Sequence, residues 1–264
     1  MKVIAIIQAR MASKRFRGKI MKEINGMPMI FWQIMRLKNS KYLDKIVVAT
    51  TEDPSDDEFC SFLKKHNFIF YRGDIKDVYS RYVNILKLEN PDYFVRITAD
   101  SPLFMSEILD KMLVLHMSSG ADYTTNNLPP TFPDGLDIEI VNRESLINLG
   151  YYKLEDYEKE HVTVGIYSRE NVFKIQNYSN RINLSQYRWT VDYQKDFEFV
   201  SRIFREFQGV ELAFSFEDVL KVLARKPEIK NEIPANKRDE SLRQVLNLPK
   251  SVSKRFILMP DKKV

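Results

Sequence analysis

A cluster of positively charged side chains follows the first apolar segment of the chain, which covers residues 3–7. The cations are Arg10, Lys14, Arg15, Arg17 and Lys19, and the small residues among them are Ala12, Ser13 and Gly18. A loop that directly follows a buried strand and offers backbone N–H groups and several cations is suited to a triphosphate. We therefore predict that this basic loop, residues 8–19, binds phosphate groups; a solvated surface loop is the alternative interpretation.

The basic loop matches neither of the common glycine-rich phosphate motifs. It lacks the Gly-x-x-x-x-Gly-Lys-Ser/Thr pattern of P-loops and the Gly-x-Gly-x-x-Gly pattern of dinucleotide-binding domains. The prediction of phosphate binding therefore rests on the position of the loop in the fold. Open α/β sheets bind ligands at the carboxyl ends of their strands, and the loop follows the first predicted strand directly.

Two aspartates follow apolar segments further along the chain. Asp100 comes after residues 93–97, and Asp192 ends residues 188–192, and we predict both segments to be buried strands. Parallel strands end on a common edge of the sheet, so both carboxylates can lie beside the basic loop. A lone aspartate at a strand end is commonly a helix cap or a turn residue. Two of them together with the basic loop favour a shared site.

The elements that must position these residues alternate along the first part of the chain. Apolar runs predict strands at residues 3–7, 46–50, 68–70 and 93–97. Helical periodicity predicts helices at residues 28–38, 55–63 and 78–88, the second of which opens on a capping box at residues 55–58. This alternation predicts an α/β fold in which a mostly parallel mixed sheet lies between two layers of helices.

The alternation breaks after about Gly120 and resumes near residue 188. Residues 136–141 predict a strand and residues 155–166 predict a helix, and two further helices are predicted at residues 197–207 and 216–223. We therefore predict one domain over residues 1–225, with an excursion at residues 120–182 and a C-terminal extension at residues 226–264.

Composition narrows the class of protein. The chain has 264 residues and a net charge of +5, and its cations are spread along the sequence, which suits a polyanionic small molecule better than nucleic acid. Cys60 is the only cysteine, so neither an intramolecular disulfide nor a Cys-rich metal site can form. The sequence shows no signal-peptide core and no membrane-spanning apolar run. We expect a cytoplasmic protein that binds neither nucleic acid nor a membrane.

Several motifs, taken in chain order, together resemble a known enzyme family. They are Ile7-Gln8-Ala9-Arg10-Met11-Ala12-Ser13-Lys14-Arg15-Phe16-Arg17-Gly18-Lys19, Lys22-Glu23-Ile24-Asn25-Gly26-Met27-Pro28, Val48-Ala49-Thr50-Thr51, Arg96-Ile97-Thr98-Ala99-Asp100-Ser101-Pro102, Phe132-Pro133-Asp134-Gly135-Leu136-Asp137, Glu160-His161-Val162-Thr163 and Arg188-Trp189-Thr190-Val191-Asp192. The family is that of the CMP-sugar synthetases, which include the acylneuraminate and 3-deoxy-manno-octulosonate cytidylyltransferases. The chain resembles most closely the branch of the spore-coat polysaccharide protein F, over about residues 3–225.

The resemblance implies a Rossmann-like nucleotidyltransferase fold similar to that of the nucleotide-diphospho-sugar transferases. It implies transfer of CMP from CTP to a sugar acid, with release of pyrophosphate, for the synthesis of a surface polysaccharide. It also implies Mg²⁺ as cofactor and a homodimer, with residues 120–182 forming an acceptor lid or the dimer interface.

The resemblance also assigns roles to individual residues. The implied catalytic residues are Arg10, Lys19, Asp100 and Asp192. The implied nucleotide-binding residues are Ala9, Arg10, Ala12, Ser13, Arg15, Lys19, Thr50 and Asp100. Asp100 and Asp192 are the implied metal ligands, and Mg²⁺ takes only a few carboxylate oxygens from a protein when it also binds phosphate.

Two departures from the family pattern occur in the basic loop. Ala12-Ser13 stands where Gly-Ser is common, and Phe16-Arg17-Gly18-Lys19 stands where Leu-Pro-Gly-Lys is common. Alanine is small enough to keep the backbone close to phosphate. Loss of the proline loosens a rigid turn, and Arg17 adds a charge. These changes affect the expected rate and substrate more than the reaction class.

The acceptor-binding residues are less well determined by the sequence. Asp134 and Asp137 flank Gly135 after a proline-rich segment, and they serve either the acceptor or the turn itself. We interpret His161 as a contact to the acceptor or to a neighbouring subunit. A sugar acid carries a carboxylate that needs a cationic partner, and the candidates are Arg143, Arg169, Lys174 and Arg188.

Two other functions remain open at this point. A glycosyltransferase of the same fold would use a nucleotide-sugar donor, but such enzymes usually show Asp-x-Asp, and Ala99-Asp100-Ser101 lacks the flanking carboxylates. A non-catalytic scaffold would keep the fold alone. The intact Lys19, Asp100 and Asp192 disfavour it, because a decayed site tends to lose its charged groups.

Overall fold

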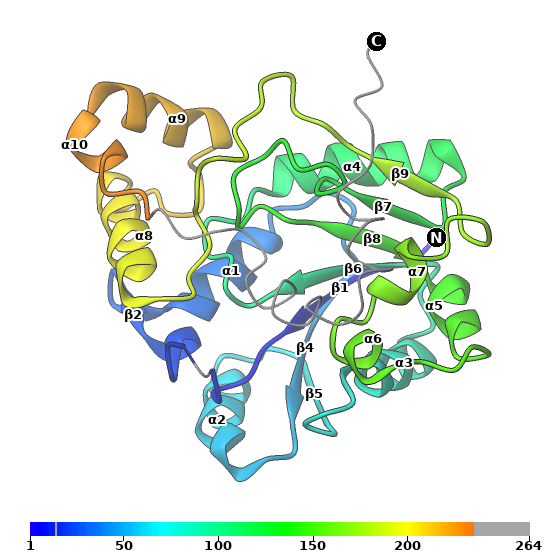
Figure 1. Cartoon of the computed structure of the whole chain (residues 1–264). Helices are drawn as coiled ribbons and strands as arrows, with labels where there is room; N and C mark the ends of the chain where they lie inside the picture. The colour runs from blue at the N-terminus through cyan, green and yellow to red at the C-terminus, as the bar shows by residue number, and fades with distance from the viewer. Residues whose placement is uncertain (14, 235–264) are drawn as a thin grey trace. The chain divides into compact units, whose positions relative to one another are not determined.

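Seven strands pair into one mixed sheet in the order β5-β4-β1-β6-β8-β7-β9 (Figure 1). The computed structural model describes residues 1–13 and 15–234; Lys14 and residues 235–264, which make up most of the predicted C-terminal extension, lie outside the described residues. Neighbouring strands are parallel except where β8 pairs with β6 and β7. The strands are β1 (Val3–Gln8), β4 (Lys45–Thr51), β5 (Phe70–Gly73), β6 (Tyr93–Thr98), β7 (Tyr123–Thr125), β8 (Glu139–Asn142) and β9 (Ile175–Asn177). A small hairpin is formed by β2 (Glu23–Ile24) and β3 (Met27–Pro28).

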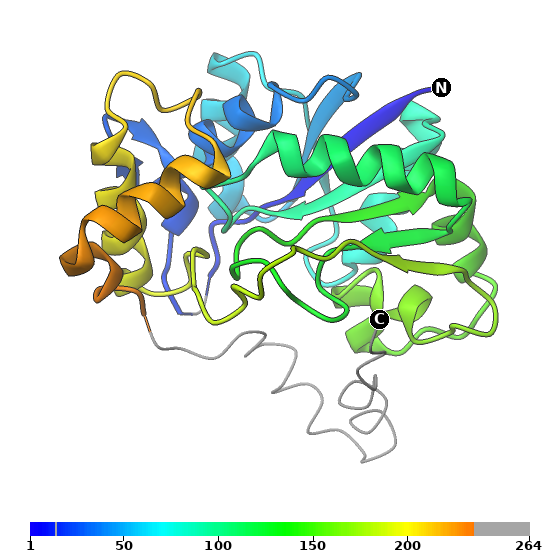
Figure 2. The same ribbon diagram turned by 90° about the horizontal axis from the view of Figure 1, so that it is seen from above.

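Helices cover both faces of the sheet and give three layers (Figures 1 and 2). The side chains of β1 alternate: Val3, Ala5 and Ile7 join the core on the first face, and Ile4 and Ile6 join the core on the second. The helices of the first face are α1 (Met29–Leu37), α2 (Asp57–Lys65), α4 (Ser106–Ser119), α8 (Gln194–Glu206) and α9 (Phe216–Arg225). Those of the second face are α3 (Val78–Glu89), α5 (Arg143–Leu149) and α7 (Val164–Tyr167). Two short helices are α6 (Asp156–Glu160) and α10 (Pro227–Lys230).

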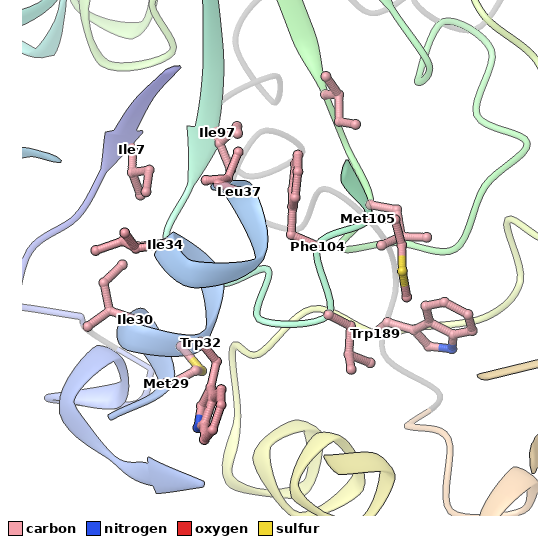
Figure 3. Packing of buried hydrophobic residues seen from close by; sticks show 14 of the residues in the cluster. Ile7, Met29, Ile30, Trp32, Ile34, Leu37, Ile97, Phe104, Met105 and Trp189 are labelled. Carbon is pink, nitrogen blue, oxygen red and sulfur yellow. The ribbon is translucent and has the colours of Figure 1, made fainter. Parts of the chain in front are cut away.

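The core of the first face reaches a segment that belongs to no strand. In Figure 3, Ile97 lies next to Leu37 of α1, and Trp189 lies beyond Phe104 and Met105. Trp189 is fully buried and packs at 5.6 Å, ring centroid to ring centroid, against Phe216. Burial of this large ring anchors the segment of residues 188–192 in the core of the first face.

The predicted alternation is confirmed over residues 1–98, with one shift. The third strand begins at Phe70, two residues later than the apolar residues 68–70 indicated, because Phe68 instead packs among the helices of the first face. The predicted strand at residues 188–192 is wrong. That segment makes only an isolated bridge from Arg188 to Asp134, and the Val191 N–H donates to the Asp100 carbonyl at 2.8 Å.

Two helix predictions also need correction. The capping box at residues 55–58 is wrong, because a 3-10 turn, η2 (Pro54–Asp56), precedes α2 and its cap is Asp53, which accepts from the Ser55 N–H at 2.9 Å. The single helix predicted at residues 155–166 is divided into α6 and α7. Val162, with φ 24°, lies between the two helices and cannot continue a right-handed helix.

Residues 120–182 contribute β7, β8, β9 and three short helices to the same sheet and its second face. The compact unit formed by the described residues extends from Met1 to Pro234. The excursion is therefore built into the fold, and its role as an acceptor lid or dimer interface remains a prediction. Within residues 1–13 and 15–234, no helix has the length and apolarity needed to cross a membrane.

Gly135 is a position where the fold requires glycine. Its φ is +99°, and an added Cβ would lie 2.7 Å from the Trp189 carbonyl carbon. We expect Gly135→Ala to lower the melting temperature far more than Gly26→Ala, because Gly26 has φ +80° but no heavy atom within 4 Å of an added Cβ. The control should cost about 1 kcal/mol, the usual penalty for a left-handed alanine. Equal melting temperatures for the two variants would contradict the close approach.

Candidate active site

The ammonium group of Lys19 lies between two carboxylates at the carboxyl edge of the sheet. Its Nζ is 3.0 Å from Asp192 Oδ1 and 3.6 Å from Asp100 Oδ2. It also donates to the Val191 carbonyl at 2.7 Å. Arg15 Nη2 lies 2.7 Å from the same Asp192 oxygen. The structure therefore brings the basic loop together with both aspartates, although they are widely separated in the sequence.

The basic loop closes on itself before it presents Lys19. The Met11 carbonyl accepts hydrogen bonds from the Ser13 N–H at 2.8 Å and from the Gly18 N–H at 3.1 Å. Gly18 has φ 67° and precedes a 3-10 helix, η1 (Lys19–Met21). Glycine adopts this left-handed conformation without the steric penalty of other residues. The tight turn thereby places Lys19 at the start of η1, facing the sheet edge.

Asp56 supports the basic loop through a set of hydrogen bonds that the sequence did not reveal. Its carboxylate is fully buried and accepts from the Met11 N–H at 2.7 Å and from the Thr50 hydroxyl at 3.0 Å. The Thr51 hydroxyl and N–H also donate to it. The Thr50 side chain is fully buried and supports the basic loop from below, and its assignment to nucleotide binding remains a prediction.

The other predicted nucleotide-binding residues lie along the same loop with different degrees of exposure. Ala9 is buried, and its N–H donates to the Ala49 carbonyl at 3.1 Å, which extends the pairing of β1 with β4. Arg10 and Ala12 are exposed, and Ser13 is half-buried. The exposed part of the loop therefore offers the Arg10 side chain to a ligand above the sheet edge.

Arg188 is the centre of a buried cluster of three aspartates. Its Nη1 lies 2.7 Å from Asp134 Oδ2, its Nη2 lies 3.2 Å from Asp192 Oδ2, and its Nε lies 3.0 Å from Asp196 Oδ1. Asp196 also accepts from the backbone N–H groups of Asp192 and Tyr193, at 2.8 and 2.9 Å. The cluster fixes both the side chain and the backbone of Asp192.

These contacts determine the charge states of the cluster. Burial alone would raise the pKa of Asp192, but Lys19 and Arg15 outweigh it and lower that pKa to about 2. Burial would lower the pKa of Arg188, but Asp196, Asp134 and Asp192 outweigh it and raise that pKa. Ionised Asp192 therefore stabilises the fold above its ordinary pKa of 3.8, and this contribution is lost as the pH falls toward 2.

Arg188 is bonded to three aspartates, and its assignment to the acceptor remains a prediction. Arg188 is 4% exposed and all of its guanidinium nitrogens are bonded to aspartates, so it cannot also bind an acceptor carboxylate without breaking the cluster. Asp134 is buried against it and belongs to the same support, whereas Asp137 and His161 are half-buried. The other candidate cations are also engaged: Arg143 pairs with Glu144, Arg169 pairs with Glu158, and Lys174 donates to the Ser119 carbonyl.

The donor set at Asp100 and Asp192 fits a magnesium ion that also binds phosphate. Asp100 Oδ1 accepts from the Thr98 hydroxyl at 2.6 Å, while its Oδ2 faces Lys19. Within the part of the chain that the structure describes, no three His, Cys, Asp or Glu side chains come together as a metal cluster. Mg²⁺ commonly binds through one or two carboxylates together with substrate phosphates and water, so two carboxylates are sufficient.

Comparisons with known proteins identify a family and several relatives. A protein-family model described as cytidylyltransferase matches residues 4–223. An uncharacterised protein of Methanocaldococcus jannaschii is 33% identical over 93% of this chain and 99% of its own length. The spore coat polysaccharide biosynthesis protein SpsF of Bacillus subtilis is 29% identical over 89% of this chain and 99% of its own length.

Solved structures show the same fold. A cytidylyltransferase from Leptospira borgpetersenii is 35% identical, has a TM-score of 0.82, and covers 87% of this chain and 96% of its own. A CMP:2-keto-3-deoxy-manno-octonic acid synthetase, solved in complex with CTP, is 15% identical with a TM-score of 0.61, and covers 78% of this chain and 99% of its own. At that identity the second similarity concerns the fold alone.

Asp196 should affect catalysis through its support of Asp192. We expect Asp196→Ala to leave Arg188 partly unpaired, to cost about 3–5 kcal/mol of stability, and to lower kcat because Asp192 is released. Asp218→Ala is the matched control. Asp218 accepts from Ser215 in the capping box of α9. Among the described residues it forms no hydrogen bond or ion pair with Lys19, Arg188 or Asp192, so its loss should lower the melting temperature slightly and leave kcat unchanged. If the two variants kept equal kcat values below their melting temperatures, the positioning role of Asp196 would be refuted.

Proposed function

The chain belongs to the cytidylyltransferase family of nucleotidyltransferases, and we propose that it transfers CMP from CTP to a sugar acid with release of pyrophosphate. The observation that carries the proposal is the position of Lys19 between Asp100 and Asp192, at the end of a loop that exposes the Arg10 side chain. Cations for the phosphates and carboxylates for a metal are thus available at one edge of the sheet.

In the proposed reaction, a hydroxyl oxygen of the acceptor attacks the α-phosphorus of CTP. An O–P bond forms, the bond from the α-phosphorus to the bridging oxygen of the β-phosphate breaks, and the hydroxyl proton is released. Arg10, Arg15 and Lys19 would offset the charge of the phosphates and of the departing pyrophosphate. Asp100 and Asp192 would hold magnesium, which when bound offsets the charge that develops on the reacting oxygens.

The sugar-acid acceptor is supported by the family and by the chemistry of its named members. The structural neighbour that was solved with CTP is a CMP:2-keto-3-deoxy-manno-octonic acid synthetase. The B. subtilis relative is named for the biosynthesis of a spore-coat polysaccharide. We propose that the product serves a surface polysaccharide. The homodimer and the cytoplasmic location remain predictions from the sequence.

Pyrophosphate release tests the reaction class. With CTP, Mg²⁺ and a panel of sugar acids, we expect pyrophosphate to form at the rate at which the acceptor is consumed, and UTP to replace CTP poorly. With nucleotide sugars as donors, we expect no release of nucleoside diphosphate. Release of nucleoside diphosphate would establish the glycosyltransferase alternative, and the absence of both products would favour a scaffold.

Substitutions in the basic loop and substitutions of the aspartates should have different kinetic effects. We expect Arg10→Ala and Lys19→Gln to weaken CTP binding by about tenfold to a hundredfold, because each removes charge-assisted hydrogen bonds to phosphate in the ground state and in the transition state. Asp192→Asn should instead reduce kcat, on the order of a hundredfold or more, with a smaller effect on the Kd for CTP.

Lys41→Ala is the control for charge, because Lys41 is exposed in the loop before β4, at the amino end of the strand. It should leave both constants unchanged. A destabilised Asp192→Asn enzyme with full kcat would remove Asp192 from the catalytic site. An Arg10→Ala enzyme with normal CTP affinity would remove the loop from phosphate binding.

A further inference from the structure

A chain of buried polar side chains crosses the second face of the sheet close to the candidate active site. Glu139, at the start of β8, forms an ion pair with Arg96 of β6, its partner in the strand register. Arg96 Nη2 also donates to Gln8 Oε1 at 3.3 Å, and Gln8 is both the last residue of β1 and the first residue of the basic loop. One connected network thus joins three strands that meet at the carboxyl edge.

The same carboxylate fastens a turn that lies outside the sheet. Glu139 Oε1 accepts from the Thr163 hydroxyl at 2.6 Å, and Thr163 is 1% exposed. Thr163 is the N-cap residue of α7, yet its hydroxyl caps no backbone N–H of that helix. A threonine at this position normally accepts a hydrogen bond from its own helix. Here the hydroxyl is used for the tertiary contact to Glu139 instead.

The backbone next to Thr163 is strained. Val162 is fully buried and has φ 24°, a conformation that is unfavourable for a β-branched side chain. Such a conformation persists only where the surroundings hold it in place, and it costs of the order of the energy of a hydrogen bond. The Thr163–Glu139 bond and the burial of Val162 provide that restraint for the turn at residues 161–163, which carries His161.

The network also lies close to Asp100. Arg96 is two residues before Thr98 on β6, so the two side chains leave the strand on the same face. The Thr98 hydroxyl donates to Asp100 Oδ1 at 2.6 Å. Arg96, which pairs with Glu139, therefore lies close in the chain to Asp100, the predicted metal ligand, and contacts Gln8 at the start of the basic loop.

A second hydroxyl group donates to the Glu139 carboxylate and allows a role in the sheet to be distinguished from a role in holding the turn. The Tyr123 hydroxyl, from β7, also donates to Glu139 Oε1 at 2.6 Å. Tyr123 joins strand to strand, whereas Thr163 joins the strand to the turn. If Glu139 served only to stabilise the sheet, the two hydroxyls would be equivalent in their effect on catalysis.

We infer that Glu139 is a positioning residue of the acceptor site. Through its bond to Thr163 it holds the turn that carries His161, and through its ion pair with Arg96 it fixes the position of that turn relative to the end of β1. An acceptor bound beside the turn is thereby kept at a fixed distance from the α-phosphate of CTP. This inference rests on the proposed function for the identity of the acceptor and on the predicted contact of His161 with that acceptor. The fastening of the turn itself rests on the contacts alone.

Three variants test the inference with 3-deoxy-manno-octulosonate as the acceptor. Thr163→Val removes the hydroxyl and keeps the shape, Thr163→Ser keeps the hydroxyl, and Tyr123→Phe removes the other donor to the same oxygen. We expect Thr163→Val to raise the KM for the acceptor by about tenfold, the effect of one hydrogen bond, and to leave the Kd for CTP within about twofold. Thr163→Ser and Tyr123→Phe should keep the KM of the unmodified enzyme, although Tyr123→Phe should lower the melting temperature.

Amide hydrogen exchange of residues 161–167 provides a readout that needs no acceptor. We expect faster exchange in Thr163→Val and unchanged exchange in Tyr123→Phe. Unchanged exchange in Thr163→Val, or equal changes in KM for Thr163→Val and Tyr123→Phe, would overturn the inference. If the unmodified protein turned over no sugar acid, the proposed function would fail, and the exchange measurement would still decide whether Glu139 fastens the turn.

Discussion

The pairing of Lys19 with Asp100 and Asp192 is the interaction on which the site depends. The negative charges of neighbouring carboxylates repel one another, and a cation that lies between Asp100 and Asp192 offsets this repulsion. Lys19 provides that cation from a loop that the strand β1 delivers to the edge of the sheet. The same arrangement suits a metal-bound triphosphate, because phosphate oxygens can take the ammonium as a partner while the carboxylates bind the metal.

Asp192 is held firmly in place although it lies outside any strand or helix. Arg188 binds it from one side and Asp196 binds its backbone from the other, and the buried Trp189 fixes the segment between them. Removing one member of a buried charged cluster leaves the remaining charges unpaired, so these residues stabilise the fold only as a set. The support of the site and the stability of this part of the fold are therefore the same physical property.

The sequence predicted the elements that local pattern determines. The apolar runs located β1, β4 and β6, and position after a strand correctly indicated where the basic loop and Asp100 lie. Asp192 lies at the expected edge for a different reason, since residues 188–192 are held by the Asp134 loop and by Asp100 instead of by a strand neighbour.

The residues that were missed depend on tertiary contacts. Asp56 had the pattern of a helix start, but it is buried under the basic loop, and Arg188 had the appearance of a free cation, but it is neutralised by three aspartates. Glu139 gave no local signal, because its partners come from β6, β7 and the start of α7. A pattern along the chain cannot show which distant charges will pair.

A crystal structure with CTP and Mn²⁺, located by its anomalous scattering, tests the central claim most directly, because Mn²⁺ accepts the same oxygen ligands as Mg²⁺. The account predicts a metal ion bound by Asp100 and Asp192 and by phosphate oxygens of CTP, with the Lys19 ammonium bonded to phosphate. A metal ion bound elsewhere, or CTP bound away from the basic loop with the Lys19–Asp192 ion pair unchanged, would contradict it.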